Sequence, residues 1–158
     1  MSYHHPMPSE LGTNSEAPNL EVLKDLCKEE IAAARTYEKA QSLPVLARHA
    51  DVLARCYALH QQRAAELGRR ITTLGGEPPN APGVWGSLMP TLATAAAAMS
   101  EKLAVSLLEE AEDRGVRRYR DQLLNLDPAN RAFLIERIVP AQDASHAAIG
   151  ELKQAVSV

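Results

Sequence analysis

Apolar residues recur every three or four positions between residues 20 and about 41, the spacing that places them on one side of a helix. We therefore predict a first helix over this stretch. Its apolar stripe contains one carboxylate, because it runs through Leu23, Leu26, Glu30, Ala33, Tyr37 and Ala40. Residues 1–18 show no such period and are rich in Pro, Ser and Asn, so they are predicted to form a flexible tail.

A second helix is predicted after Pro44, a residue that suits the first turn of a helix. Its apolar positions are spaced by sevens, as in a bundle helix, and one of them holds a histidine: Leu46, Leu53, His60, Leu67 and Leu74. The helix should end at Gly75 and Gly76. Because the turn before Pro44 is short, the first two helices should be antiparallel neighbours.

The stretch "GGEPPNAPGVWG" comes next, and about sixteen residues separate the second helix from the next periodic segment. At ~3.3 Å per residue this loop can reach roughly 50 Å, enough to run back along a helix of about 25 residues. A third helix is predicted from residues 87–91 to about 125. The fourth comes after Asp127 and Pro128, with a kink at Pro140, and carries Ile135, Ile138, Val139, His146, Ile149 and Leu152.

The predicted fold is therefore all-α: two antiparallel helical hairpins joined by a long crossover loop, forming a four-helix bundle over residues 19–158. An internal repeat supports this plan. Glu30 in "EIAAARTY" matches Glu112 in "EDRGVRRY" at an offset of 82, and His60 matches Asp143 at an offset of 83. The two halves resemble a duplicated hairpin. Counting from the turns, all four positions should lie at nearly one level of the bundle.

Composition narrows the class of protein. Apolar residues make up 46% of the 158 residues but aromatics only 4%, which suits a core of small aliphatic side chains on helices. A net charge of −3 without a basic block argues against nucleic-acid binding, and no apolar run is long enough to span a membrane. With two cysteines and no secretory signal, we expect a cytoplasmic, bacterial-type chain. Cys27 and Cys56 should stand ~10 Å apart along the bundle, too far for a disulfide.

The helical part, from "LEVLKDLCKEE" to "AAIGELK", resembles the ferritin-like superfamily, and in particular a bacterial ferritin-like family of uncharacterised function. In its metal-loaded members, two helices each supply a Glu and two each supply Glu-x-x-His, which together hold two metal ions. Glu30 and Glu112 match the first pair, and Asp143-x-x-His146 nearly matches the motif of the fourth helix. The second helix departs from the pattern, because His60-x-x-Arg63 stands where Glu-x-x-His is expected.

Charge decides how many metal ions such a set could hold. Three carboxylates and the positive charge of Arg63 give a net charge of −2. One divalent ion with two neutral histidines would balance this charge, and so would two protonated histidines without metal. Two divalent ions would overshoot. We therefore expect at most one divalent ion, Fe, Mn or Zn, or none, with these candidate ligands: Glu30, His60, Glu112, Asp143 and His146.

Three functions remain open from the sequence. One is a ferritin-like protein whose site has decayed into a structural or one-metal centre, and the second is a metal-dependent oxidase or ferroxidase. The third is a helical interaction module whose polar cluster only fixes helix register. If the third predicted helix is rotated by one residue from the orientation assumed here, Glu109 or Glu110 would face the interior in place of Glu112. Tyr37 and Tyr119 are interpreted as core aromatics reaching carboxylates across the bundle, and the alanines of residues 93–98 as a packing face, consistent with a homodimer or larger homo-oligomer.

Overall fold

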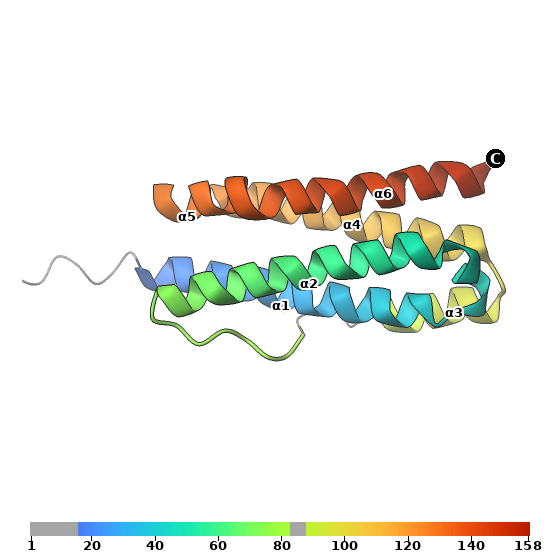
Figure 1. The fold of residues 1–158 in the computed structure, drawn as a ribbon, viewed down its shortest axis with the longest axis horizontal. Coiled ribbons are helices and arrows are strands. Elements are labelled where there is room, and N and C mark those ends of the chain that lie inside the picture. The colour runs from blue at the N-terminus through green and yellow to red at the C-terminus, as the bar shows by residue number, and fades with distance from the viewer. Residues whose placement is uncertain (1–15, 83–87) are drawn as a thin grey trace, which may run out of the picture.

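The computed structural model describes residues 16–82 and 88–158. Within them every regular element is helical, so the predicted all-α class is confirmed for this part of the chain (Figure 1). None of the described helices combines the length and the apolar character needed to cross a membrane. The elements are α1 (Glu16–Gln41), η1 (Pro44–His49), α2 (Ala50–Thr73), α3 (Leu88–Ala97), α4 (Glu101–Leu123), α5 (Pro128–Phe133), η3 (Leu134–Ile138) and α6 (Val139–Ser157).

The long helices form two antiparallel pairs. α1 packs along α2, α4 packs along α6, and α2 contacts α6 between the pairs (Figure 1). α2 ends where α5 begins, whereas α4 starts at the opposite end of the molecule, beside α3 (Figure 1). α3, which precedes α4 in the chain, therefore lies at the opposite end of the molecule from the end of α2 (Figure 1).

α1 begins earlier than its apolar stripe predicted. The helix starts at Glu16, so residues 16–18, which the sequence assigned to a tail, belong to it, while residues 1–15 lie outside the described part. Asn19 is buried, and its side-chain oxygen accepts a hydrogen bond of 2.9 Å from the backbone N–H of Asp127. This contact ties the first turns of α1 to the start of α5.

The seam spaced by sevens faces the interior as predicted. Leu53, His60 and Leu67 of α2 and Leu46 of η1 are buried, while Leu74 at the end of the seam is half-buried. Gly75 ends the helix with a φ of 79°, in the left-handed region that glycine enters without steric strain. The predicted glycine stop is confirmed.

The prediction of a single helix from residues 87–91 to about 125 is wrong. The helix is interrupted at Met99, which adopts a φ of 53°, and α4 begins after Ser100. The Ser100 hydroxyl accepts a hydrogen bond of 3.2 Å from the backbone N–H of Leu103, which satisfies a donor that the helix end leaves open. The predicted helix ran through Ser100 as an interior residue, so the role of this serine as an N-cap was missed.

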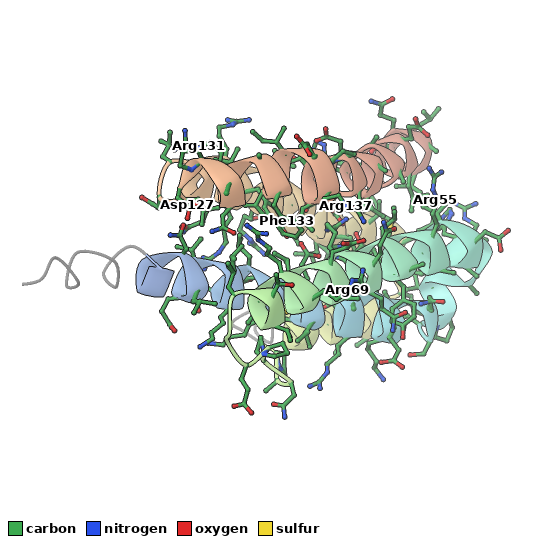
Figure 2. The ribbon with its side chains drawn as sticks, turned by 60° about the vertical axis from the view of Figure 1, so that its left-hand side comes forward. Arg55, Arg69, Asp127, Arg131, Phe133 and Arg137 are labelled. Atoms are coloured by element: carbon green, nitrogen blue, oxygen red, sulfur yellow. The ribbon has the colours of Figure 1, made fainter. Side chains whose placement is uncertain are left out.

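The kink predicted at Pro140 takes the form of a π turn just before it. Pro140 has no N–H to donate to the preceding turn, and η3 widens the helix at residues 134–138. Before the turn, the Asp127 carboxylate caps α5 through a 2.8 Å bond from the N–H of Asn130. Phe133 lies between the helical pairs (Figure 2), with the Arg70 guanidinium 5.5 Å from its ring centre.

Two separate apolar clusters form the core. One, toward the α3 end, includes Leu46, Leu53, Leu92, Val105, Leu108 and Ile149. The other, toward the α5 end, includes Leu23, Leu26, Leu67, Ile71, Leu134 and Ile138. Four buried charged or polar side chains lie between the two clusters along their helices, where burial removes most of their contact with water: Glu30, His60, Arg63 and Glu112.

Candidate functional site

Two carboxylates and two tyrosines cross-link α1 and α4 through the interior. The Tyr37 hydroxyl of α1 donates a hydrogen bond of 2.8 Å to Glu112 Oε1 of α4. Reciprocally, the Tyr119 hydroxyl of α4 donates one of 2.6 Å to Glu30 Oε1 of α1. All four side chains are buried, and the interpretation of both tyrosines as core aromatics that reach carboxylates across the bundle is confirmed.

His60 of α2 bridges the two carboxylates. Its Nδ1 lies 2.7 Å from Glu30 Oε2, and its Nε2 lies 2.9 Å from Glu112 Oε1. The ring also stacks on Tyr37, with 5.1 Å between the ring centres. Three of the five predicted ligand positions, Glu30, His60 and Glu112, therefore do meet at one level.

Arg63, one turn further along α2, brings a second basic group to the same centre. Its side chain is fully buried, and its Nε lies 2.9 Å from Glu30 Oε2. The Nε–H does not point at that oxygen, so the contact is an ion pair without a hydrogen bond. Nη1 donates to the backbone oxygen of Ala141 on α6 at 2.8 Å, which fixes the guanidinium between the two helical pairs.

The contacts of His60 Nδ1 bear on its protonation state. This atom lies 2.7 Å from both Glu30 Oε2 and Arg63 Nη2, so it donates to the carboxylate or accepts from the guanidinium. A doubly protonated ring sets its Nδ1–H beside the Arg63 Nη2 donor, whereas a neutral ring turns a lone pair toward an ionised carboxylate and leaves the centre at −1, the greater cost for a buried group. We therefore assign both ring protons, and Glu30, Glu112, His60 and Arg63 then sum to −2 + 2 = 0.

The electrostatics agree with this assignment. Burial would raise the pKa of Glu30, but the charges of Arg63 and His60 lower it to about 2. Burial likewise opposes ionisation of Glu112, whose pKa is nevertheless lowered by its hydrogen bond and charge interaction with His60. Burial would lower the pKa of His60, yet the Glu30 charge and the hydrogen bonds to both carboxylates raise it.

α6 presents different residues from those predicted. Gln142 Nε2 and Ser145 Oγ donate to Glu112 Oε2 at 3.1 and 2.9 Å, and both side chains are buried. Asp143 is exposed, and His146 lies partly exposed with its Nε2 2.6 Å from Asp113 Oδ1. The expectation that Asp143 and His146 face the centre is therefore corrected, because α6 is turned by one residue relative to the predicted phase.

The internal repeat already contained the right phase. Glu30 and Tyr37 match Glu112 and Tyr119 at an offset of 82. At the same offset, His60 and Arg63 of α2 correspond to Gln142 and Ser145 rather than to Asp143 and His146. Buried Cys56 likewise corresponds to buried Ile138. On the other side of the π turn, buried Leu53 pairs with buried Leu134 at an offset of 81, so η3 contains one inserted residue. The offset of 83 that the sequence analysis gave to His60 and Asp143 is therefore one residue too large.

These residues do not fit a pair of metal ions. The α2 positions hold an imidazole bonded to two carboxylates and a guanidinium, which cannot lose its proton to become a ligand. The α6 positions hold an amide and a hydroxyl, both weak ligands for transition metals. Within the described residues, no group of three or more His, Cys, Asp or Glu side chains is arranged to hold a metal ion.

Both cysteines lie in the apolar clusters rather than in the centre. Cys27 and Cys56 are buried and free, as predicted from their positions along the bundle. Burial raises the pKa of Cys27 to about 11 and that of Cys56 to about 12, each with a smaller contribution from a nearby carboxylate. Neither thiol is a nucleophile at neutral pH.

A cleft leads from the surface to the centre. It has a volume of about 400 Å³ and is lined mainly by residues of α1 and α4, with His60 of α2 and Gln142 of α6. The backbones of α1 and α4 approach each other less closely than those of α1 and α2 or of α4 and α6. Glu30, His60 and Glu112 form its inner end, and Arg114, Arg117 and Arg118 line it further out. The buried charges therefore face a space large enough for a small molecule.

A family model described as "Domain of unknown function (DUF2383)" matches residues 19–125, well over half of the chain. The match spans α1 to α4 and includes Glu30, His60, Arg63 and Glu112, whereas Gln142 and Ser145 lie beyond it. No curated protein and no solved structure matches the chain. The chain belongs to the family of the DUF2383 domain.

Proposed function

We propose that this protein is a ferritin-like bundle in which Arg63 and His60 take the electrostatic role of metal ions, and that it acts as a metal-independent structural and binding module. The observation that carries the proposal is the position of His60 between Glu30 and Glu112, with Arg63 paired to Glu30 beside it. The ferritin-like assignment rests on the resemblance of the sequence and on one carboxylate from each of α1 and α4 facing the same interior centre.

Charge balance supports a centre without metal. The four ionised side chains sum to zero, and buried charge is stable when it is paired and hydrogen-bonded. One divalent ion with a neutral His60 would leave a net charge of −2 + 1 + 2 = +1, and two ions would leave +3. Metal binding would thus have to displace a proton from His60 and still create a buried charge.

The competing function, a di-metal oxidase or ferroxidase, needs several carboxylate and imidazole ligands and open coordination positions for O₂ or peroxide. In this chain both ring nitrogens of His60 are bonded to carboxylates, and Glu112 Oε2 receives hydrogen bonds from Gln142 and Ser145. Every carboxylate oxygen of the centre has a protein donor or cation beside it. This arrangement favours a stabilised polar core over a redox centre.

Thermal unfolding of the full chain tests the proposal. Addition of Mn²⁺, Zn²⁺ or anaerobic Fe²⁺, and separately of a chelator, should leave the melting temperature unchanged, because no ligand-linked stabilisation acts on the centre. Asp143→Asn serves as a control for metal bound at the surface, since Asp143 is exposed and outside the centre. A metal-dependent increase that persists in Asp143→Asn, together with about one bound equivalent of metal, would contradict the proposal.

A further inference from the structure

The cleft between α1 and α4 combines a polar inner end with a mouth that holds three arginines beside two acidic residues, Glu29 and Asp121. Leu26 and Ala33 of α1 and Ala111 of α4 give it apolar walls. Its inner end is formed by buried side chains of the charged centre, and its outer part by long, exposed side chains of α4. A cleft with apolar side chains in its walls and different polar groups at its two ends is suited to a ligand with two different polar ends.

The mouth carries three arginines on one side of α4. Arg114, Arg117 and Arg118 all line the cleft and are exposed. Arg114 pairs with Glu110 at 3.4 Å and Arg118 with Glu29 at 3.9 Å, both at the surface, where such pairs are weak. Arg117 forms no ion pair within the described residues. Arg117 is thus available to an oxyanion, whose geometry matches its paired donors, and Arg118 can join it by leaving its weak surface pair with Glu29.

The inner end offers hydrogen-bond acceptors rather than further positive charge. A carboxylate oxygen has two lone pairs, and in the described part of the chain Glu30 Oε1 accepts one hydrogen bond, from Tyr119. The positive charges of Arg63 and His60 are directed at the carboxylates themselves. A hydroxyl group that enters the cleft can therefore donate a hydrogen bond to an ionised carboxylate at its inner end. An anionic group at the same place would be repelled by that carboxylate.

We propose that this cleft binds a small organic oxyanion, a carboxylate or phosphate, that carries a hydroxyl group at its other end. The oxyanion is held by Arg117 and Arg118 at the mouth, and the hydroxyl donates to Glu30 Oε1. This inference goes beyond the metal-independent role proposed above, because it assigns an occupant to the cleft, and its test uses a different readout from metal binding.

Titrations followed by ¹H–¹⁵N NMR of the full chain test it with matched ligands. Glycerol 3-phosphate should shift amide signals along the facing sides of α1 and α4 and saturate. Propyl phosphate, which lacks the hydroxyls, should bind about tenfold more weakly, because it leaves an ionised acceptor unmatched. Glycerate against propionate repeats the comparison for a carboxylate, and inorganic phosphate alone measures what the mouth contributes.

Two double variants of equal charge separate site binding from general attraction. Arg117→Gln with Arg118→Gln should weaken glycerol 3-phosphate binding at least about tenfold. Arg55→Gln with Arg69→Gln, exposed arginines of α2 that do not line the cleft (Figure 2), should leave it unchanged. Equal weakening in both variants, equal affinity for glycerol 3-phosphate and propyl phosphate, or shifts away from the cleft would each overturn the proposal.

Discussion

Arg63 of α2 and Glu30 of α1 form an ion pair in the interior, with 2.9 Å between Arg63 Nε and Glu30 Oε2. Arg63 is fully buried and Glu30 is 4% exposed, so water screens the two charges only weakly. The repeat-related position to Arg63 in α6 is Ser145, which is neutral. The two halves of the bundle are thus alike in their carboxylates and tyrosines but unlike in charge, and α2 supplies all the positive charge of the centre.

The first prediction concerns this ion pair. Arg63→Met keeps much of the side-chain volume but leaves the centre with one uncompensated negative charge, and should destabilise the fold by about 3–5 kcal/mol. Chemical denaturation measures the change in the free energy of unfolding. Arg137→Met is the matched control: Arg137 lies on the surface between α6 and α2 (Figure 2) and pairs with Glu66 at 3.0 Å, so the loss should stay below about 1 kcal/mol.

The same centre predicts that a second substitution compensates for the first. Glu30→Gln in the Arg63→Met background removes the unpaired negative charge and leaves His60 balanced by Glu112. The double variant should then lose about 1–3 kcal/mol less free energy of unfolding than the two single variants lose in sum. Strict additivity would show that the two side chains do not act as a charge pair.

The second prediction is the pH dependence of stability. The pKa of His60 is raised in the fold, so its contribution is full below the ordinary value of 6.5 and is lost as pH rises through the folded value. The pKa of Glu30 is lowered from 4.5 to about 2, so its contribution is present above 4.5 and is lost as pH falls toward 2. The free energy of unfolding should therefore be highest between these limits and decline on both sides.

A histidine outside the centre provides the control for the alkaline decline. His146→Gln, which alters the partly exposed pair with Asp113, should preserve the shape of the pH profile. His60→Gln should lower stability and remove the decline above pH 6.5, because the titrating group is gone. An unchanged alkaline decline in His60→Gln would show that another group causes it.

The third prediction uses the symmetry of the tyrosines. Tyr37→Phe and Tyr119→Phe each remove one hydrogen-bond donor from a buried carboxylate and should each cost about 1–3 kcal/mol. Tyr57→Phe is a control, because Tyr57 is only partly buried and its hydroxyl contacts exposed Gln61, and should change stability by no more than about 0.5 kcal/mol. Equal, small effects at all three positions would contradict the role of the buried hydroxyls.

Much of the architecture could be predicted from spacing alone. The apolar stripe that contains Glu30 and the seven-residue spacing that contains His60 predicted which faces of α1 and α2 are buried. This works because side chains follow one another around a helix at a fixed angle, so the sequence alone gives the direction of each. The capping role of Asp127 was also readable, since Pro128 comes directly after it. Local rules of this kind need no knowledge of the neighbouring helices.

Two features depended on information that local spacing does not carry. The break at Met99 comes directly after a run of helix-forming alanines, and only the cap at Ser100 marks the restart of the helix. The facing side of α6 depends on the one-residue insertion at η3, because each added residue rotates the rest of the helix by about 100°. Asp143 and His146 were interpreted as ligands because Asp and His are common at metal sites. The residues of α6 that face the centre stand one position earlier in the chain.

The fourth prediction turns this phase into a test with designed metal sites. His60→Glu, Arg63→His, Gln142→Glu and Ser145→His together would supply Glu-x-x-His on both α2 and α6 next to Glu30 and Glu112. Four carboxylates with two neutral histidines balance two divalent ions, so this variant should bind close to two equivalents of Fe²⁺ or Mn²⁺ in anaerobic calorimetry.

A variant built on the other phase is its control. His60→Glu, Arg63→His and Asp143→Glu, with native His146, carry a complete motif on α6 that faces outward. This variant should bind fewer than two equivalents. Two equivalents in the control and none in the first variant, with both shown to be folded by circular dichroism, would mean that Asp143 and His146 face the centre after all.

The protonation state of His60 tests the central claim most directly, because the charge of its ring completes the neutral centre without metal. Long-range ¹H–¹⁵N correlation of the imidazole signals, assigned by their loss in His60→Gln, reports whether each ring nitrogen carries a proton. At about pH 7.5, a pH where an ordinary histidine is mostly neutral, both nitrogens of His60 should still be protonated. A neutral ring with one protonated nitrogen at that pH would contradict the account.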